Sequence, residues 1–155
     1  LGLDDTSKGE QKIARVICQG DNSKTKDKYE FDVYLKTCAN SVLYFSGEKE
    51  CDFGCLGYGD CERICPFDAI HVNEKGIAVV DEAMCTGCTK CVAACPKRIV
   101  DMVPKSSKVS VLCNSRQKGA EAKNICEVAC ITCTICVKAC PVDAIEINHN
   151  LAKID

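Results

Sequence analysis

Residues 85–96 read CTGCTKCVAACP, and residues 130–141 read CITCTICVKACP. Both stretches follow the spacing C-x2-C-x2-C-x3-C-P, in which three thiolates on a tight loop bind three corners of an iron–sulfur cubane. The fourth Cys starts a helix and faces the other way, so in proteins with two clusters it binds the neighbouring cluster. The Pro that follows suits the first turn of a helix, where no N–H is needed. These two copies of the pattern predict [4Fe–4S] clusters.

An altered copy of the pattern precedes them at residues 51–66, CDFGCLGYGDCERICP. The first, third and fourth places of the pattern are filled by Cys55, Cys61 and Cys65, but Tyr58 occupies the second. One interpretation is that Cys51 supplies the missing ligand, because the glycines of this loop allow the chain to reroute. The alternative is a cluster with three Cys ligands, either [3Fe–4S] or a cubane with one other ligand, and Cys51 would then join Cys18 and Cys38 in a separate site or as buried thiols. Tyr58 is expected to cover the cluster rather than to bind it.

The fourth Cys of each motif binds the neighbouring cluster, which we call the crossed rule. This rule assigns ligands to each predicted cluster. One complete cluster is expected on Cys65, Cys85, Cys88 and Cys91. The other complete cluster is expected on Cys51, Cys55, Cys61 and Cys95. A third is expected on Cys130, Cys133 and Cys136, with its fourth ligand and the partners of Cys140 beyond residue 155, or with Cys126 as a substitute. No motif surrounds the three remaining cysteines, which are interpreted either as buried thiols or as further ligands: Cys18, Cys38 and Cys113.

Composition supports metal as the main source of stability. The chain has 155 residues, 16 of them Cys, but no Trp and only four Tyr and four Phe, so a conventional aromatic-rich core is not expected. A disulfide scaffold is the usual meaning of so many cysteines in secreted proteins, but the polar start of the chain shows no signal peptide. Zinc sites usually combine two separated C-x2-C pairs and do not need the C-x3-C-P ending. Iron–sulfur clusters are therefore the favoured interpretation.

The net charge and the hydropathy argue against two further features, nucleic-acid binding and a membrane-spanning segment. The net charge of −2 argues against a nucleic-acid-binding protein. No run of about 18 apolar residues occurs, so we expect no transmembrane segment within this stretch of chain.

The order of the motifs predicts an α+β fold in three parts. Residues 51–103 are expected to form a bacterial-ferredoxin-like (βαβ)2 unit, residues 104–155 an incomplete second unit, and residues 1–50 a small N-terminal extension. Within the extension, residues 12–18 are predicted to form a strand, and residues 37–47 a short helix ending at Gly47, with a strand over SVLYF as the alternative.

An internal repeat relates the two predicted units. CPFDAIHVNEKGIAVVD (65–81) aligns with CPVDAIEINHNLAKID (140–155), and each copy predicts a hairpin. A weaker echo precedes each copy, because ARVIC resembles VSVLC and CDFGC resembles CEVAC. The second copy stops where the first leads into another motif, so we expect the chain to be part of a longer polyferredoxin.

With these motifs placed, the sequence resembles the cytoplasmic polyferredoxin part of the B subunit of Rnf complexes, the ion-translocating ferredoxin:NAD oxidoreductases of anaerobes. The resemblance is carried by RVICQG (15–20), KECDFGCLGYGDCERICPFDAIHV (49–72), CTGCTKCVAACPKRIV (85–100), PKSSKVSVLCNSRQKG (104–119) and ACITCTICVKACPVDAI (129–145). In that family a membrane helix and a four-Cys cluster domain come first, and a further motif follows.

The resemblance implies an electron-carrying subunit without a catalytic site of its own. Such a subunit would take electrons from reduced soluble ferredoxin and pass them to the membrane and flavin subunits of the complex. It would lie on the cytoplasmic side of the cell membrane, held through partner subunits or through a missing N-terminal helix. Two alternatives stay open: a ferredoxin-like subunit of another anaerobic oxidoreductase, such as a hydrogenase or a 2-oxoacid oxidoreductase, and an iron–sulfur redox sensor.

Overall fold

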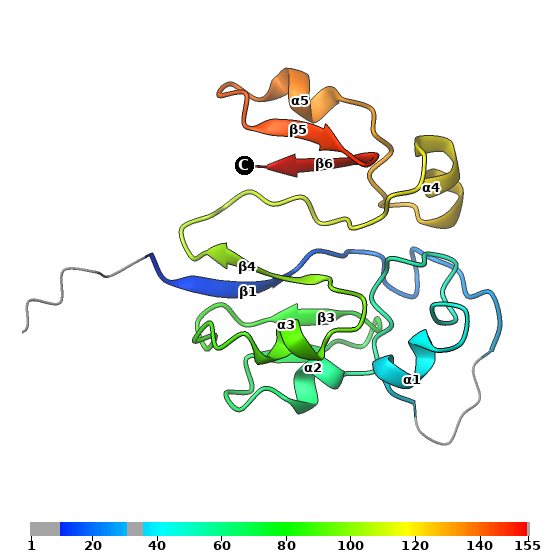
Figure 1. The fold of residues 1–155 in the computed structure, drawn as a ribbon, viewed down its shortest axis with the longest axis vertical. Helices are drawn as coiled ribbons and strands as arrows, with labels where there is room; N and C mark the ends of the chain where they lie inside the picture. Colours follow the sequence, from blue (N-terminus) through cyan, green and yellow to red (C-terminus); the bar gives the residue numbers. More distant parts are fainter. Residues whose placement is uncertain (1–9, 31–35, 155) are drawn as a thin grey trace, which may run out of the picture.

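The computed structural model describes residues 10–30 and 36–154, which form short helices and strands joined by long loops (Figure 1). In chain order the elements are β1 (Lys12–Val16), α1 (Cys38–Val42), α2 (Asp60–Arg63), β2 (Ile70–Val72), β3 (Ala78–Val80), α3 (Lys90–Ala94), β4 (Val100–Pro104), α4 (Gly119–Ile125), α5 (Ile135–Ala139), β5 (Ile145–Asn148) and β6 (Leu151–Ile154). The expected mixture of helix and strand is confirmed. No helix of the described residues is long and apolar enough to cross a membrane.

The strands form three antiparallel pairs: β1 with β4, β2 with β3, and β5 with β6. The last two pairs are the hairpins that the sequence repeat predicts. The first pair joins distant segments, with Lys12 opposite Pro104 and Val16 opposite Val100. A strand from the expected N-terminal extension therefore completes a sheet with the end of the segment expected as the first ferredoxin-like unit. The division of the chain at residues 50 and 103 stays a prediction.

The β1–β4 ribbon lies between two groups of elements (Figure 1). On one side are α2, α3 and the β2–β3 hairpin, which together with β1 and β4 we call the β1–β4 unit. On the other side is the α4–β6 unit. Alternating side chains of a strand point to opposite faces, so Ala14 and Val16 face the core of the β1–β4 unit while Ile13 faces away from it. Ile13 is nevertheless 0% exposed, because the chain covers both faces of β1.

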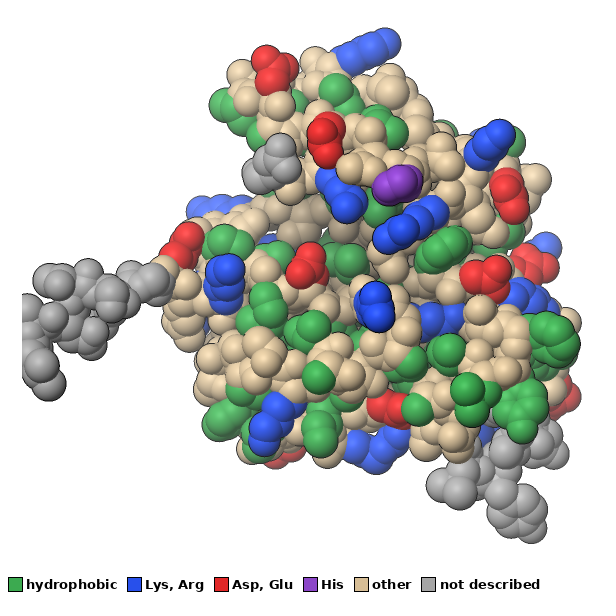
Figure 2. Space-filling model, viewed as in Figure 1, with side chains coloured by type: hydrophobic (Ala, Val, Ile, Leu, Met, Phe, Trp, Pro, Cys, Tyr) green, Lys and Arg blue, Asp and Glu red, His purple; other side chains and the backbone are tan. Residues whose placement is uncertain are grey.

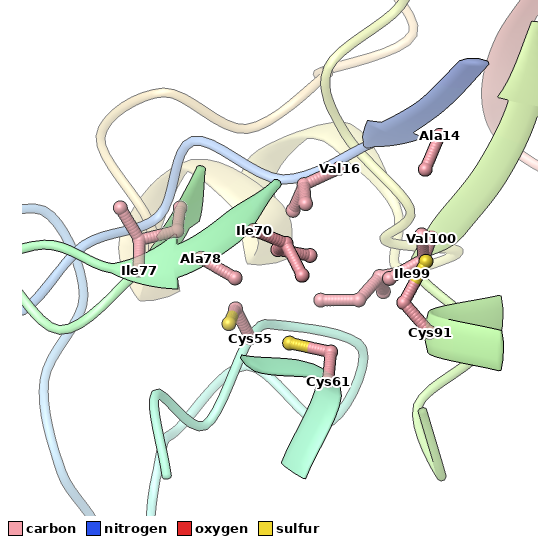
Figure 3. Packing of buried hydrophobic residues seen from close by; sticks show 10 residues of the cluster. All are labelled: Ala14, Val16, Cys55, Cys61, Ile70, Ile77, Ala78, Cys91, Ile99 and Val100. Atoms are coloured by element: carbon pink, nitrogen blue, oxygen red, sulfur yellow. The ribbon is translucent and has the colours of Figure 1, made fainter. Parts of the chain in front are cut away.

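The core of the β1–β4 unit is small and is built partly from thiols (Figure 3). Its buried members are Ala14, Val16, Cys55, Cys61, Ile70, Ile77, Ala78, Cys91, Ile99 and Val100. In Figure 3 the sulfurs of Cys55 and Cys61 approach one another beneath the β2–β3 hairpin, and the sulfur of Cys91 lies near Val100. Short apolar side chains surround the thiols, so the sequence supplies little apolar burial apart from them.

The segment expected as a helix ending at Gly47 is helical only over α1. Thr37 caps it, because its hydroxyl accepts the Asn40 N–H at 3.1 Å. The apolar residues that favoured a strand lie on the surface instead, with Leu43 80% and Phe45 85% exposed. The alternative strand over SVLYF is therefore wrong.

Residues 109–113, VSVLC, repeat the ARVIC of β1 in sequence but form no strand. A strand needs a neighbour for its N–H and C=O groups. β4 provides that neighbour for β1, whereas no described segment pairs with residues 109–113. The face drawn in Figure 2 is hollowed nearby, where a groove runs between β4 and β6.

Replacing Ile13 by Ala tests whether β1 is buried on both faces. We expect Ile13→Ala to lower the free energy of unfolding by about 2–5 kcal/mol, the usual cost of emptying a buried apolar site. Val79→Ala, at a position of β3 that is 39% exposed, is the control and should change it far less. Urea unfolding followed by loss of iron–sulfur absorbance measures both variants. Equal midpoints for the two would contradict the burial of β1.

Candidate metal centres

The sixteen cysteines all lie in the described part of the chain, and none of them forms a disulfide. Twelve of them line three small cavities, four to each cavity. These cavities have similar empty volumes of about 340, 390 and 400 Å³, openings included, and are called site A, site B and site C.

Site A lies between β1 and the loop that leads into α3. Its cysteines are Cys65, Cys85, Cys88 and Cys91. The structure thus brings together the four residues that the crossed rule assigns to one cluster. The Ala14 N–H donates to Cys85 Sγ at 3.3 Å, so β1 contributes a hydrogen bond to a sulfur of this cavity. Gly87 has φ +75°, and a Cβ there would lie 2.3 Å from the Lys12 carbonyl oxygen, so only glycine allows this loop to approach β1 so closely.

Site B lies between α2 and the end of α3. Its cysteines are Cys38, Cys55, Cys61 and Cys95. Three of them belong to the predicted set, but the structure places Cys38 at this cavity where the sequence interpretation placed Cys51. Each of α2 and α3 serves both sites, since Cys61 and Cys65 flank the end of α2 as Cys91 and Cys95 flank the end of α3.

Cys38 reaches site B because α1 is fastened to the start of α2. The Asp60 carboxylate accepts the N–H groups of Cys38 and Ala39, each at 3.0 Å. Asp60 directly precedes Cys61, so these two hydrogen bonds set the first turn of α1 beside a cysteine of site B. Sequence spacing gave no sign of this contact, because 22 residues separate Cys38 from Asp60.

Tyr58, which occupies the second place of the altered motif, does not line the site B cavity. Burial raises the pKa of its phenol, and a hydrogen bond with Glu48 raises it further. The Tyr58 carbonyl accepts a hydrogen bond from Arg63 at 2.7 Å. Tyr58 therefore supports the loop through Glu48 and Arg63, and a neutral phenol is a poor metal ligand.

Site C lies where the β1–β4 unit meets the α4–β6 unit. Its cysteines are Cys18, Cys51, Cys113 and Cys126. A Cβ on Gly20 would lie 3.2 Å from Cys126 Sγ and 3.8 Å from Cys18 Sγ, so the sulfurs of two distant segments flank this glycine. The sequence interpretation left Cys18 and Cys113 as buried thiols or further ligands, and its favoured assignment placed Cys51 and Cys126 with other clusters.

The pKa shifts of the thiols reflect the same grouping of the cysteines into sites. Burial raises the pKa of Cys18 to about 11 and that of Cys61 to about 12. Neighbouring thiols act in the same direction: Cys61 is affected by Cys55, Cys38 and Cys95. Burial also raises the pKa of Cys51, and Cys126 and Cys113 add to the effect. Such thiols stay protonated at neutral pH until a metal displaces the proton, so acid should weaken metal binding.

The third motif is more open than the other sites. Cys133 and Cys136 are exposed, whereas Cys130 and Cys140 are half-buried. The Cys140 sulfur accepts the Ala144 N–H at 3.3 Å. Cys126, the predicted substitute ligand for this motif, lines site C instead.

The donor sets fit iron–sulfur clusters better than single ions. Among the described residues, no three His, Cys, Asp or Glu side chains are grouped so that they could hold one metal ion. A zinc ion needs four thiolates at about 2.3 Å from one centre. In a cubane each thiolate binds a different iron, so the sulfurs spread around a larger body. The four thiols of each site surround a cavity and do not converge on one point, so they match the arrangement around a cubane.

Comparison with known proteins also indicates iron–sulfur clusters. Residues 50–99 and 84–144 match a family described as 4Fe-4S dicluster domain. This match confirms the prediction of [4Fe–4S] clusters. The two overlapping matches include the altered motif and both intact ones.

Three curated relatives illustrate the similarity. The B subunit of the Na(+)-translocating ferredoxin:NAD(+) oxidoreductase complex of Acetobacterium woodii is 47% identical over 145 residues, 94% of this chain and 43% of the relative. The B subunit of the proton-translocating ferredoxin:NAD(+) oxidoreductase complex of Clostridium ljungdahlii is 41% identical, over 94% of this chain and 51% of the relative. The B polypeptide of the polysulfide reductase of Wolinella succinogenes is 30% identical, over 72% of this chain and 60% of the relative. The first two confirm the resemblance drawn from the motifs, and the chain spans about half of their length.

Removing the metal tests how far the clusters hold the fold. Chelation of iron under anaerobic conditions should abolish the cooperative thermal transition, because thiols replace apolar side chains in the core. Circular dichroism on heating measures the transition, and reconstitution with iron and sulfide should restore it. A chelated protein that keeps its transition would show that the apolar contacts alone suffice.

Proposed function

Because the chain belongs to the family of 4Fe-4S dicluster domains, we propose that it relays electrons within an ion-translocating ferredoxin:NAD oxidoreductase complex. The observation that carries the proposal is the pair of adjoining four-cysteine cavities, site A and site B, linked by two short helices. A cubane bound by four thiolates has no open iron position for a substrate. Transfer of single electrons is the chemistry that remains.

The ligands we propose follow the two cavities. At site A the cluster is bound by Cys65, Cys85, Cys88 and Cys91. At site B it is bound by Cys38, Cys55, Cys61 and Cys95. A third cluster uses Cys130, Cys133 and Cys136 of the third motif. Each cluster supplies a one-electron couple, and the protein positions the sulfurs and directs N–H groups toward them.

The shared helices explain why electrons should pass readily between sites A and B. Cys61 lies on α2 and Cys65 just beyond its end, four residues on, while Cys91 lies on α3 and Cys95 caps its end, again four residues on. Each pair places one thiol at each site, so two short covalent paths join the clusters. We propose that β1 and β4 complete a (βαβ)2 ferredoxin unit around them.

The partners in this proposal come from the named relatives. Reduced soluble ferredoxin is the donor, and the other subunits of the complex are the acceptors, on the cytoplasmic side of the cell membrane. The face drawn in Figure 2 intersperses acidic and basic side chains, which suits contacts that form and break repeatedly. The similarity to a polysulfide reductase component supports a second candidate, an electron-transfer subunit of another reductase.

Electron transfer is tested with the full-length protein purified without oxygen. Reduced ferredoxin should bleach its visible absorbance rapidly, and an oxidant should restore it through many cycles without loss of iron. A Cys85→Ala variant, which lacks a ligand at site A, should lose part of the bleaching. A redox sensor would instead lose its clusters on oxidation. A protein that reduced ferredoxin leaves unchanged, but a reductase partner reduces, would favour the second candidate.

The ligand at site B is tested by comparing two cysteine variants. Cys38→Ala should remove the cluster at site B and with it the magnetic coupling that broadens the site A signal. Cys51→Ala should leave that coupling intact, because Cys51 lines a different cavity. Electron paramagnetic resonance of the fully reduced full-length proteins measures the coupling. The opposite result would restore Cys51 as the site B ligand.

A further inference from the structure

Site C is built by two segments from each half of the chain. Cys18 and Cys51 come from the first half of the chain, and Cys113 and Cys126 from the second. Its empty volume of about 400 Å³ is close to the 390 Å³ of site B, openings included. The cavity thus matches site B in size and in number of thiols, and three of the four site B cysteines lie within the residues that match the 4Fe-4S dicluster family.

The internal repeat relates the two pairs of cysteines that form site C. Cys18 ends ARVIC as Cys113 ends VSVLC, and Cys51 begins CDFGC as Cys126 begins CEVAC. The repeat therefore contributes one pair of thiols from each copy. A site assembled in this way is a consequence of the duplication rather than a chance meeting of buried cysteines.

The hydrogen bonds at site C repeat as well. The Cys55 N–H donates to Cys18 Sγ at 3.4 Å, and the Cys130 N–H donates to Cys113 Sγ at 3.3 Å. Cys55 and Cys130 are themselves the last residues of the repeated five-residue stretches. Backbone N–H groups directed at sulfur stabilise the negative charge of a metal-bound thiolate.

These contacts also place site C between two other centres. Cys51 stands four residues before Cys55 of site B, and Cys126 stands four residues before Cys130 of the third motif. The same spacing joins site A to site B through α2 and α3. The two units are further joined here by a backbone hydrogen bond from the Glu127 N–H to the Lys24 carbonyl at 3.0 Å.

We propose that site C holds an additional [4Fe–4S] cluster, bound by Cys18, Cys51, Cys113 and Cys126, which connects the clusters of the two units. In the relay its oxidised form accepts one electron from the reduced cluster at site B and passes one electron to the cluster of the third motif. The direction reverses if the donor docks at the other end, and no bond or proton changes place. The site is independent of which oxidoreductase complex the chain serves.

Three cysteine variants of the full-length protein test the proposal. Cys113→Ala, Cys126→Ala and the double variant should each lose about four irons and four sulfides per chain. The losses should not add, because both thiols bind one cluster. Val128→Ala changes an apolar residue of the same cavity wall and serves as the control, with its iron content unchanged. Unchanged iron in the two single variants, or the loss of a zinc ion instead, would overturn the proposal.

A labelling experiment on the unaltered protein covers the case in which these variants do not fold. Cys18, Cys51 and Cys113 are only half-buried, so free thiols there should react with an alkylating reagent. In the iron-loaded protein we expect mass spectrometry to find all four site C thiols unmodified, and labelled after iron is removed. Alkylation of Cys51 or Cys113 while the iron content stays constant would count decisively against a cluster at site C.

Discussion

The structure depends on one repeated constraint: two thiols four residues apart that line two neighbouring cavities, the proposed metal centres. A loop or a single helical turn between such thiols is too short to let either centre move independently. The pair at the end of α2 and the pair at the end of α3 together fix sites A and B relative to one another. The pair at Cys51 and Cys55 extends the same constraint from site B to site C.

This constraint explains how a chain with few aromatic residues can hold its shape. Cys55, Cys61 and Cys91 occupy positions in the core that larger apolar side chains fill in most small domains. In the proposed clusters, bonds from iron to thiolate would replace weaker apolar contacts, and each cluster would join segments that are distant in sequence. The short strands then need only to orient the loops, as β1 does when its Ala14 N–H donates to Cys85.

Site A could be predicted completely from the sequence, because three of its cysteines share one motif and the crossed rule supplies the fourth. The interpretation of site B placed Cys51 where the structure has Cys38. The contact between α1 and Asp60 arises from tertiary packing, which leaves no periodic trace in sequence. Four separate segments each contribute one cysteine to site C, so no local spacing of cysteines identifies it. Its only signal was the weak repeat of ARVIC and CDFGC in the second half.

Lys49 gives an independent physical reason for negative charge at site C. Its side chain is 2% exposed, and its ammonium donates to the Gly20 carbonyl at 3.5 Å, beside the sulfurs of Cys18 and Cys126. None of the described carboxylates forms an ion pair with it. Burying an unpaired ammonium is costly unless an anion lies near. Burial raises the pKa of Cys126 while the Lys49 charge lowers it, so this lysine favours the thiolate that a cluster requires.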